Sequence, residues 1–125
     1  MKNKFEDGII TTLERTKNIE TLEWNDHKSF KGVSLKHLVT GKDTNNQLSC
    51  HLVRVDPHCI LDTHLHDGLL EIHEVIAGFG TLSLDKDQVT YNVGSISVIP
   101  ANINHKVVAG NEGLYILAKF SPALL

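Results

Sequence analysis

The feature that most limits what this chain can fold into is a succession of short β-rich runs separated by turn-forming residues. Residues with high β propensity fill the segments 33–40, 48–55, 71–77, 81–85, 88–93, 95–99, 105–108 and 114–120. Gly, Pro, Asn and Asp mark the breaks at 41–46, 56–57, 78–80, 85–87, 94, 100–102 and 110–113. Many short strands at even spacing predict an all-β sandwich or barrel.

The length of the chain sets the number of domains. With 125 residues, of which 41% are hydrophobic and 22% charged, the sequence can build one domain with a real core but not two. The net charge of −3 gives no reason to expect nucleic acid or an acidic membrane surface as a partner. No run approaches the ~18 apolar residues of a membrane span, and no apolar signal core comes after Met1. The sequence therefore predicts a cytoplasmic protein.

The first thirty residues carry the weakest pattern. Ile9, Ile10 and Leu13 suit one short helical turn, and the segment 19–24 partly alternates like an edge strand. No linker composition separates this part from the rest of the chain. We therefore expect residues 1–30 to form an N-terminal extension that packs on the barrel or on a partner subunit, and residues 31–125 to form the barrel domain.

The densest group of metal-capable side chains lies between Thr63 and Gly78. His64 and His66 are two residues apart, so on an extended strand both rings project from one face, with Cα atoms roughly 6.6 Å apart. Glu71 comes after a short turn and opens the next apolar run, whose alternation turns its carboxylate back toward the two rings. Two histidines and one carboxylate are the beginnings of a facial metal-ligand set.

A later stretch, 94–110, adds His105 and completes a resemblance to the cupin family. The first cupin motif is G-x5-H-x-H-x3-4-E-x6-G, and the second is G-x5-P-x-G-x2-H-x3-N. The residues that match the two motifs are His64, His66, Glu71, Gly78, Gly94, Pro100 and His105. Three positions depart from the motifs, because His58 and Asn102 replace glycines and Ala109 replaces the closing Asn. Asn adopts the left-handed backbone conformation readily, and His less so.

The resemblance covers residues 52–120 and implies both a fold and a cofactor. The fold would be the eight-stranded jelly roll, or double-stranded β-helix, in one domain. Family members bind one divalent metal ion, here through His64, His66, Glu71 and His105, and the ion can be iron, zinc, manganese or nickel. The family also implies a homodimer.

His73 is an unusual residue for this pattern. On a regular strand it shares its face with Glu71 and Val75, so it should point into the barrel. There it can act as a general acid or base beside the metal, as an extra ligand, or as a residue that orients a ligand by a hydrogen bond. If the strand is bulged, His73 instead pairs with another polar group. Glu74 falls on the opposite face and replaces Glu71 as ligand only if the register slips by one residue.

Four other residues bear on a pocket. His51 and Arg54 project to opposite faces of one strand, so one of them should face the pocket, and an inward Arg54 would suit a carboxylate substrate. His27 and His37 have the pattern of solvated residues.

Two classes of function are consistent with these residues. Three neutral imidazoles, one carboxylate and a divalent ion leave a centre of net charge about +1, which attracts anionic oxygen. The first class is a small metal-dependent enzyme for a small oxygenated substrate, either a dioxygenase or an isomerase or lyase acting on a compound such as a sugar acid. The second is a non-catalytic metal or small-ligand sensor, because residues 24–57 also resemble the cupin domain of anti-sigma factors.

Overall fold

The structure is a computed structural model that describes residues 4–125, with eight strands in one curved sheet and two in a separate hairpin. The strands are β1 (Ile9–Thr11), β2 (Thr16–Asn18), β3 (Asn25–Asp26), β4 (Val33–Val39), β5 (Ser49–Val55), β6 (Ile60–His64), β7 (Leu70–Leu84), β8 (Asp87–Tyr91), β9 (Ile96–Ile99) and β10 (His105–Ser121). The helical elements are η1 (Lys4–Asp7), η2 (Ile19–Thr21) and α1 (Gly41–Thr44). In this part of the chain, no helix is long and apolar enough to cross a membrane.

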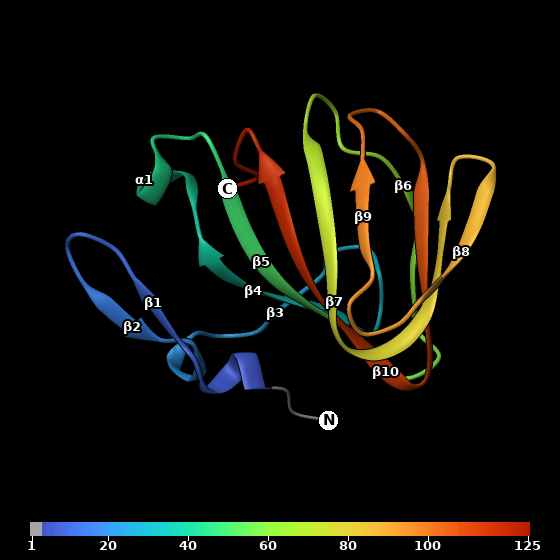
Figure 1. Cartoon of the computed structure of the whole chain (residues 1–125), viewed down its shortest axis with the longest axis horizontal. Helices are drawn as coiled ribbons and strands as arrows, with labels where there is room; N and C mark the ends of the chain where they lie inside the picture. The colour runs from blue at the N-terminus through green and yellow to red at the C-terminus, as the bar shows by residue number, and fades with distance from the viewer. Residues whose placement is uncertain (1–3) are drawn as a thin grey trace.

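Two long strands, β7 and β10, hold the sheet together. They pair with each other along most of their length and bend together (Figure 1). The first half of β7 pairs with β9 and its second half with β8. The first half of β10 pairs with β6, and its second half with β5. Each strand therefore contributes to two layers, which is the arrangement of a jelly roll.

The bends fall where the sequence predicted turns. The segments 78–80 and 110–113 lie inside β7 and β10, and the register between these strands shifts there. Gly78 has a φ of 78°, and a Cβ at this position would collide with the carbonyl of Gly113. These glycines let the paired strands bend without ending, so the prediction of four separate strands in these parts was wrong.

The other strands agree with the predicted runs more closely, with one omission. The strands β4, β5, β8 and β9 lie within the predicted runs, apart from one residue at the start of β8. The sequence predicted no run for β6, because its apolar alternation is weak, and Leu61 is the one buried residue of this strand. The strand ends at His64, so His66 lies in the loop beyond it rather than on the same strand.

Two apolar clusters form on the two faces of the main sheet. The inner cluster fills the space between the layers with Val33, Val53, Val55, Leu61, Val75, Leu82, Tyr91, Ile99, Val107, Ala109, Leu114, Ile116, Ala118 and Phe120. The outer cluster contains Ile19, Leu38, Leu52, Tyr115 and Leu117. Alternation along β5 places His51 inside and Arg54 outside, where its guanidinium lies 4.1 Å from the Trp24 ring centroid. The inward Arg54 that would suit a carboxylate substrate is therefore absent.

The N-terminal residues cover the outer cluster. Ile19 is only 3% exposed, and Ile10, Leu22 and Trp24 pack against the same cluster. Burial of an Ile side chain stabilises a fold by about 1.5–3 kcal/mol. The local structure differs from the expectation, because residues 9–11 form a strand rather than a helical turn, and η2 takes the place of an edge strand at 19–24. Residues 9–11 form a strand because their backbone pairs with β2 in a hairpin. Residues 19–21 form η2, which buries Ile19 beside the sheet.

Candidate metal centre

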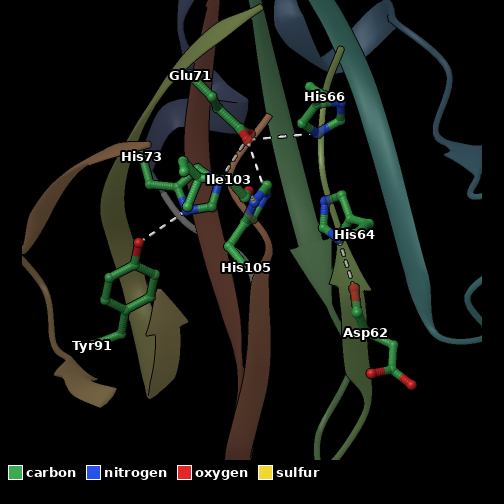
Figure 2. A network of polar contacts seen from close by, with 8 residues as sticks. All are labelled: Asp62, His64, His66, Glu71, His73, Tyr91, Ile103 and His105. Carbon is green, nitrogen blue, oxygen red and sulfur yellow. Dashed lines mark hydrogen bonds and ion pairs between the residues drawn. The ribbon is translucent and has the colours of Figure 1, made fainter. Parts of the chain in front are cut away.

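The side chains that the motifs single out converge inside the barrel. In Figure 2 the carboxylate of Glu71 lies between the rings of His66, His73 and His105. The ligand atoms of His64, His66 and His105 all lie within 4.8 Å of one another, and so do those of Glu71, His73 and His105. His105 belongs to both groups, so the two triads form one cluster.

The pairing of strands and a linked pair of loops bring these residues together. His64 at the end of β6 lies opposite His105 at the start of β10. Asn102 joins the loop before β10 to the loop after β6. Its side-chain oxygen accepts a hydrogen bond from the backbone amide of Gly68, and its backbone amide donates one to the carbonyl of His66, both at 3.1 Å. Asn102 and His58 have φ values of 64° and 62°. Both residues thus adopt the left-handed conformation that suits the motif's glycines.

Hydrogen bonds to the backbone fix the tautomer of two of the rings. The Nδ1 atom of His64 lies 2.6 Å from the Asp62 carbonyl oxygen, and Nδ1 of His105 lies 3.1 Å from that of Ile103. A carbonyl only accepts, so Nδ1 carries the proton in both rings. The lone pair of each neutral ring is therefore on Nε2, where it can bind a metal.

Two buried atoms at the centre have no hydrogen-bond partner among the described residues. They are Oε1 of Glu71 and Nε2 of His105, which lie 3.2 Å apart without forming a hydrogen bond. The Nε2 atom of His66 lies 3.6 Å from the same carboxylate oxygen. An oxygen anion and a nitrogen lone pair that face each other inside a protein are costly unless a cation lies between them. The residues present thus fit a divalent metal ion.

The charge states also suit a cation. Burial alone would raise the Glu71 pKa, but the neighbouring His73 and His105 rings lower it well below its ordinary value. Burial lowers the pKa of His64 to about 4 and also lowers the pKa of His66. Near neutral pH Glu71 is therefore a carboxylate and the rings of His64 and His66 are neutral, which are the forms that bind metals.

His73 points into the barrel, as predicted, and both of its ring nitrogens are engaged. The residue is 1% exposed, its Nε2 lies 2.9 Å from Glu71 Oε2, and its Nδ1 lies 2.9 Å from the Tyr91 hydroxyl (Figure 2). A carboxylate only accepts, so Nε2 carries a proton. Burial raises the pKa of Tyr91 to about 12, which keeps this hydroxyl protonated. His73 thus links Glu71 to Tyr91.

The sequence analysis placed Glu74 correctly and overlooked Tyr91. Glu74 lies on the other face of β7 in an ion pair with Lys119, so the one-residue slip that would make it a ligand does not occur. Tyr91 lies at the end of β8 and is fully buried. A buried Tyr hydroxyl needs a hydrogen-bond partner, and this rule could have paired Tyr91 with the inward His73.

A small cavity of about 70 Å³ opens onto the cluster. It is lined by His64, His66 and Glu71, together with His27, Val33, Leu35, Val53, Leu61, Phe120 and Leu124. Phe120 presents its ring to His66 at a centroid distance of 4.8 Å. His27, expected to be a solvated residue, is partly exposed, and the loop before β4 also places it in the cavity wall.

Comparisons with known proteins support the fold and leave the reaction open. No model of a known protein family matches the sequence, and no curated protein sequence does either. Solved structures do match. KdgF from Halomonas sp. shares 21% identity over 82% of this chain and 90% of that chain, with a TM-score of 0.73. A predicted oxalate decarboxylase from Thermotoga maritima shares 23% identity over 82% and 92%, with a TM-score of 0.73. An RmlC-like cupin from Shewanella frigidimarina shares 21% over 84% and 87%, with a TM-score of 0.72.

These similarities define the fold of the chain. It is the cupin jelly roll, as the two motifs predicted, built as a single small domain. Its interior carries a cluster of histidines and a glutamate that can hold a metal ion.

Proposed function

We propose that this protein is a metal-dependent enzyme that acts on a small oxygen-bearing substrate, as a dioxygenase or as an isomerase or lyase. The observation that carries the proposal is the unpartnered pair of Glu71 Oε1 and His105 Nε2, buried beside the other two ligand rings. We assign His64, His66, Glu71 and His105 as the ligands of one divalent ion. Such an ion would polarise a substrate oxygen and stabilise negative charge that develops on it.

The protein groups around these ligands supply positioning and a proton path. His73 donates to Oε2 of Glu71, which leaves Oε1 directed at the other ligands. We propose that His73 holds Glu71 in this orientation and exchanges a proton with the Tyr91 hydroxyl, 2.9 Å from its Nδ1. The apolar walls of the cavity give the ligands a lining of low polarity, which strengthens electrostatic interactions inside.

The neighbouring structures supply analogies for the chemistry. They include KdgF, oxalate decarboxylases and an ectoine synthase. At identities of 23% or less, these proteins support an enzyme in general and select no reaction for this chain. A homodimer in the cytoplasm stays a prediction.

Elemental analysis of protein purified without added metal or affinity tag tests the ligand assignment, and oxygen uptake with diketones, catechols and thiols tests the reaction. Stoichiometric iron with substrate-dependent uptake would establish a dioxygenase. Zinc or nickel without uptake would favour an isomerase or a sensor. A His73→Ala variant should still bind metal, with an affinity about 10–100-fold lower, because His73 orients Glu71 rather than contacting the ion in this assignment. A loss of metal affinity as large as that in His105→Ala would make His73 a ligand.

A further inference from the structure

We propose that the substrate is a compact and mostly apolar molecule with one oxygen-bearing end that binds the metal, and that His27 donates a hydrogen bond to it from Nε2. This inference rests on the proposed metal centre and narrows its substrate class. The walls of the cavity and the tautomer of His27 carry it.

The cavity walls favour apolar chemistry. Besides the three ligand residues and His27, all of the lining residues are apolar, namely Val33, Leu35, Val53, Leu61, Phe120 and Leu124. Among the described residues, no lysine or arginine lines this cavity. A sugar acid placed here would bury several hydroxyl groups without partners, and each such group weakens binding by about tenfold or more.

The size and charge of the site further restrict the class of substrate. The volume of about 70 Å³ is several times the roughly 10–15 Å³ that one water requires, so it admits a molecule of a few heavy atoms. Three neutral rings, one carboxylate and a divalent ion sum to about +1, which balances one anionic group on the substrate. Arg54, the one arginine on a strand, faces outward and so cannot balance a second anionic group on the substrate. An enolised diketone, with one delocalised negative charge and an apolar skeleton, satisfies these conditions.

Hydrogen bonds from the backbone fix the tautomer of His27. The amide nitrogens of Ser29 and Phe30 lie 3.1 and 3.3 Å from its Nδ1, and both donate to it. An Nδ1 atom that accepts cannot carry the proton, so the neutral ring carries it on Nε2. Burial lowers the pKa of His27, which favours this neutral form. Across residues 4–125, no hydrogen bond to Nε2 is found.

The ring of His27 is also held in place within the wall. It stacks on Phe30 with a centroid distance of 4.6 Å and an interplanar angle of 24°, and Phe30 packs against His64 at 5.8 Å. His27 therefore has a fixed N–H donor, and the residue lines the same cavity as His64. A donor in that place suits a substrate oxygen that approaches the metal centre.

Binding of two probes to the metal-loaded protein tests the substrate class. The probes are acetylacetone, a compact diketone, and D-galacturonate, a polyhydroxylated acid, and isothermal titration calorimetry measures each Kd. We expect acetylacetone to bind at least about tenfold more tightly. Equal affinities, tighter binding of galacturonate, or no binding of either probe to protein with stoichiometric metal would overturn the substrate class. Elemental analysis of the same samples reports separately whether the metal centre itself exists.

Matched variants test His27. In His27→Asn the side-chain oxygen can still accept from the amides of residues 29 and 30, while the Nε2 donor is lost. We expect acetylacetone to bind about tenfold more weakly, with metal content and Tm unchanged. His27→Gln places an amide donor near the Nε2 position and should recover part of the affinity. His58→Asn is the control, since His58 is exposed and left-handed with φ 62°, a conformation that Asn adopts.

The outcomes are distinct. Unchanged affinity in His27→Asn, or a Gln variant as weak as the Asn variant, would overturn the donor role of His27. An equal loss in His58→Asn would show that the effect is unrelated to the cavity and would overturn that role as well.

Discussion

The barrel contains two groups of buried and partly buried histidines, and the groups differ in what their ring nitrogens contact. In the first group, at the metal centre, Nε2 of His105 faces the Glu71 carboxylate without a hydrogen bond. In the second, Nδ1 of His51 lies 2.8 Å from Nδ1 of His37, and its Nε2 lies 2.8 Å from the Ser49 hydroxyl. Both nitrogens of His51 are thus satisfied by neutral protein groups. The first group leaves atoms that a ligand must satisfy, and the second does not.

The comparison teaches that a concentration of histidines does not by itself mark a binding site. The second group has a structural use, because the Ser49 hydroxyl also accepts from the amide of Leu124 at 2.8 Å. Leu124 in turn lines the cavity over the metal centre. The His37–His51 pair therefore supports the wall of the candidate site.

The largest expected effect separates the two groups by metal content. Substituting His105→Ala removes one of four ligands, and we expect metal affinity to fall by more than about 100-fold, since loss of one residue that only orients a ligand already costs about 10–100-fold. His64→Ala should behave alike, and both variants should lose the stabilisation that bound metal provides. Elemental analysis after gel filtration measures the loss. Unchanged metal content in both variants would contradict the ligand assignment.

The matching substitution in the second group should affect stability alone. His51 is 0% exposed, and His51→Ala leaves a cavity and removes the partners of His37 and Ser49. We expect a loss of about 3 kcal/mol in the free energy of unfolding and a fall of about 10 °C in Tm. Metal content should stay at the wild-type value under conditions where the variant is folded. If the His51→Ala protein were folded but had lost its metal, the claim that the second group affects only stability would be wrong.

The sequence predicted the ligand cluster better than its surroundings, and the reason is physical. His64, His66, Glu71 and His105 stand at the motif positions of the cupin resemblance, and the structure brings them together even though His66 lies in the loop after β6. The partnership of His73 with Tyr91 joins residues of two different strands, so it depends on the relative positions of these strands, which spacing along the chain does not give.

The fold shows the same limit. Alternation along β5 predicted that His51 and Arg54 face opposite ways, but only the packing of Trp24 shows that Arg54 faces outward. Glycines at 78–80 and 110–113 suggested turns that end a strand. The sequence does not show that β7 and β10 pair with each other on both sides of these bends, so the two continuous strands were not predicted. In both cases contacts between distant segments decide what local propensity leaves open.

The smallest expected effect is a difference in pH dependence that His51 causes. Burial and the nearby His37 lower the His51 pKa to about 4 in the folded protein, against 6.5 in an unfolded chain. As the pH falls from 6.5 towards 4, His51 binds a proton in the unfolded chain but not in the folded chain. The contribution of His51 to stability is therefore complete above pH 6.5 and is lost as the pH decreases. Between pH 7 and 5 this one group should remove about 2 kcal/mol.

The His51→Gln variant isolates this contribution, since Gln does not titrate and can still contact Ser49 from its amide nitrogen. Urea denaturation of metal-free wild type and variant at about pH 7, 6 and 5 measures the difference. His64, with a pKa also lowered to about 4, contributes in both proteins and cancels in the comparison. The wild type should therefore lose about 2 kcal/mol more than the variant on acidification. If both lost the same amount, His51 would have to carry its charge when folded, and the pair with His37 could not be the neutral structural contact that separates it from the metal centre.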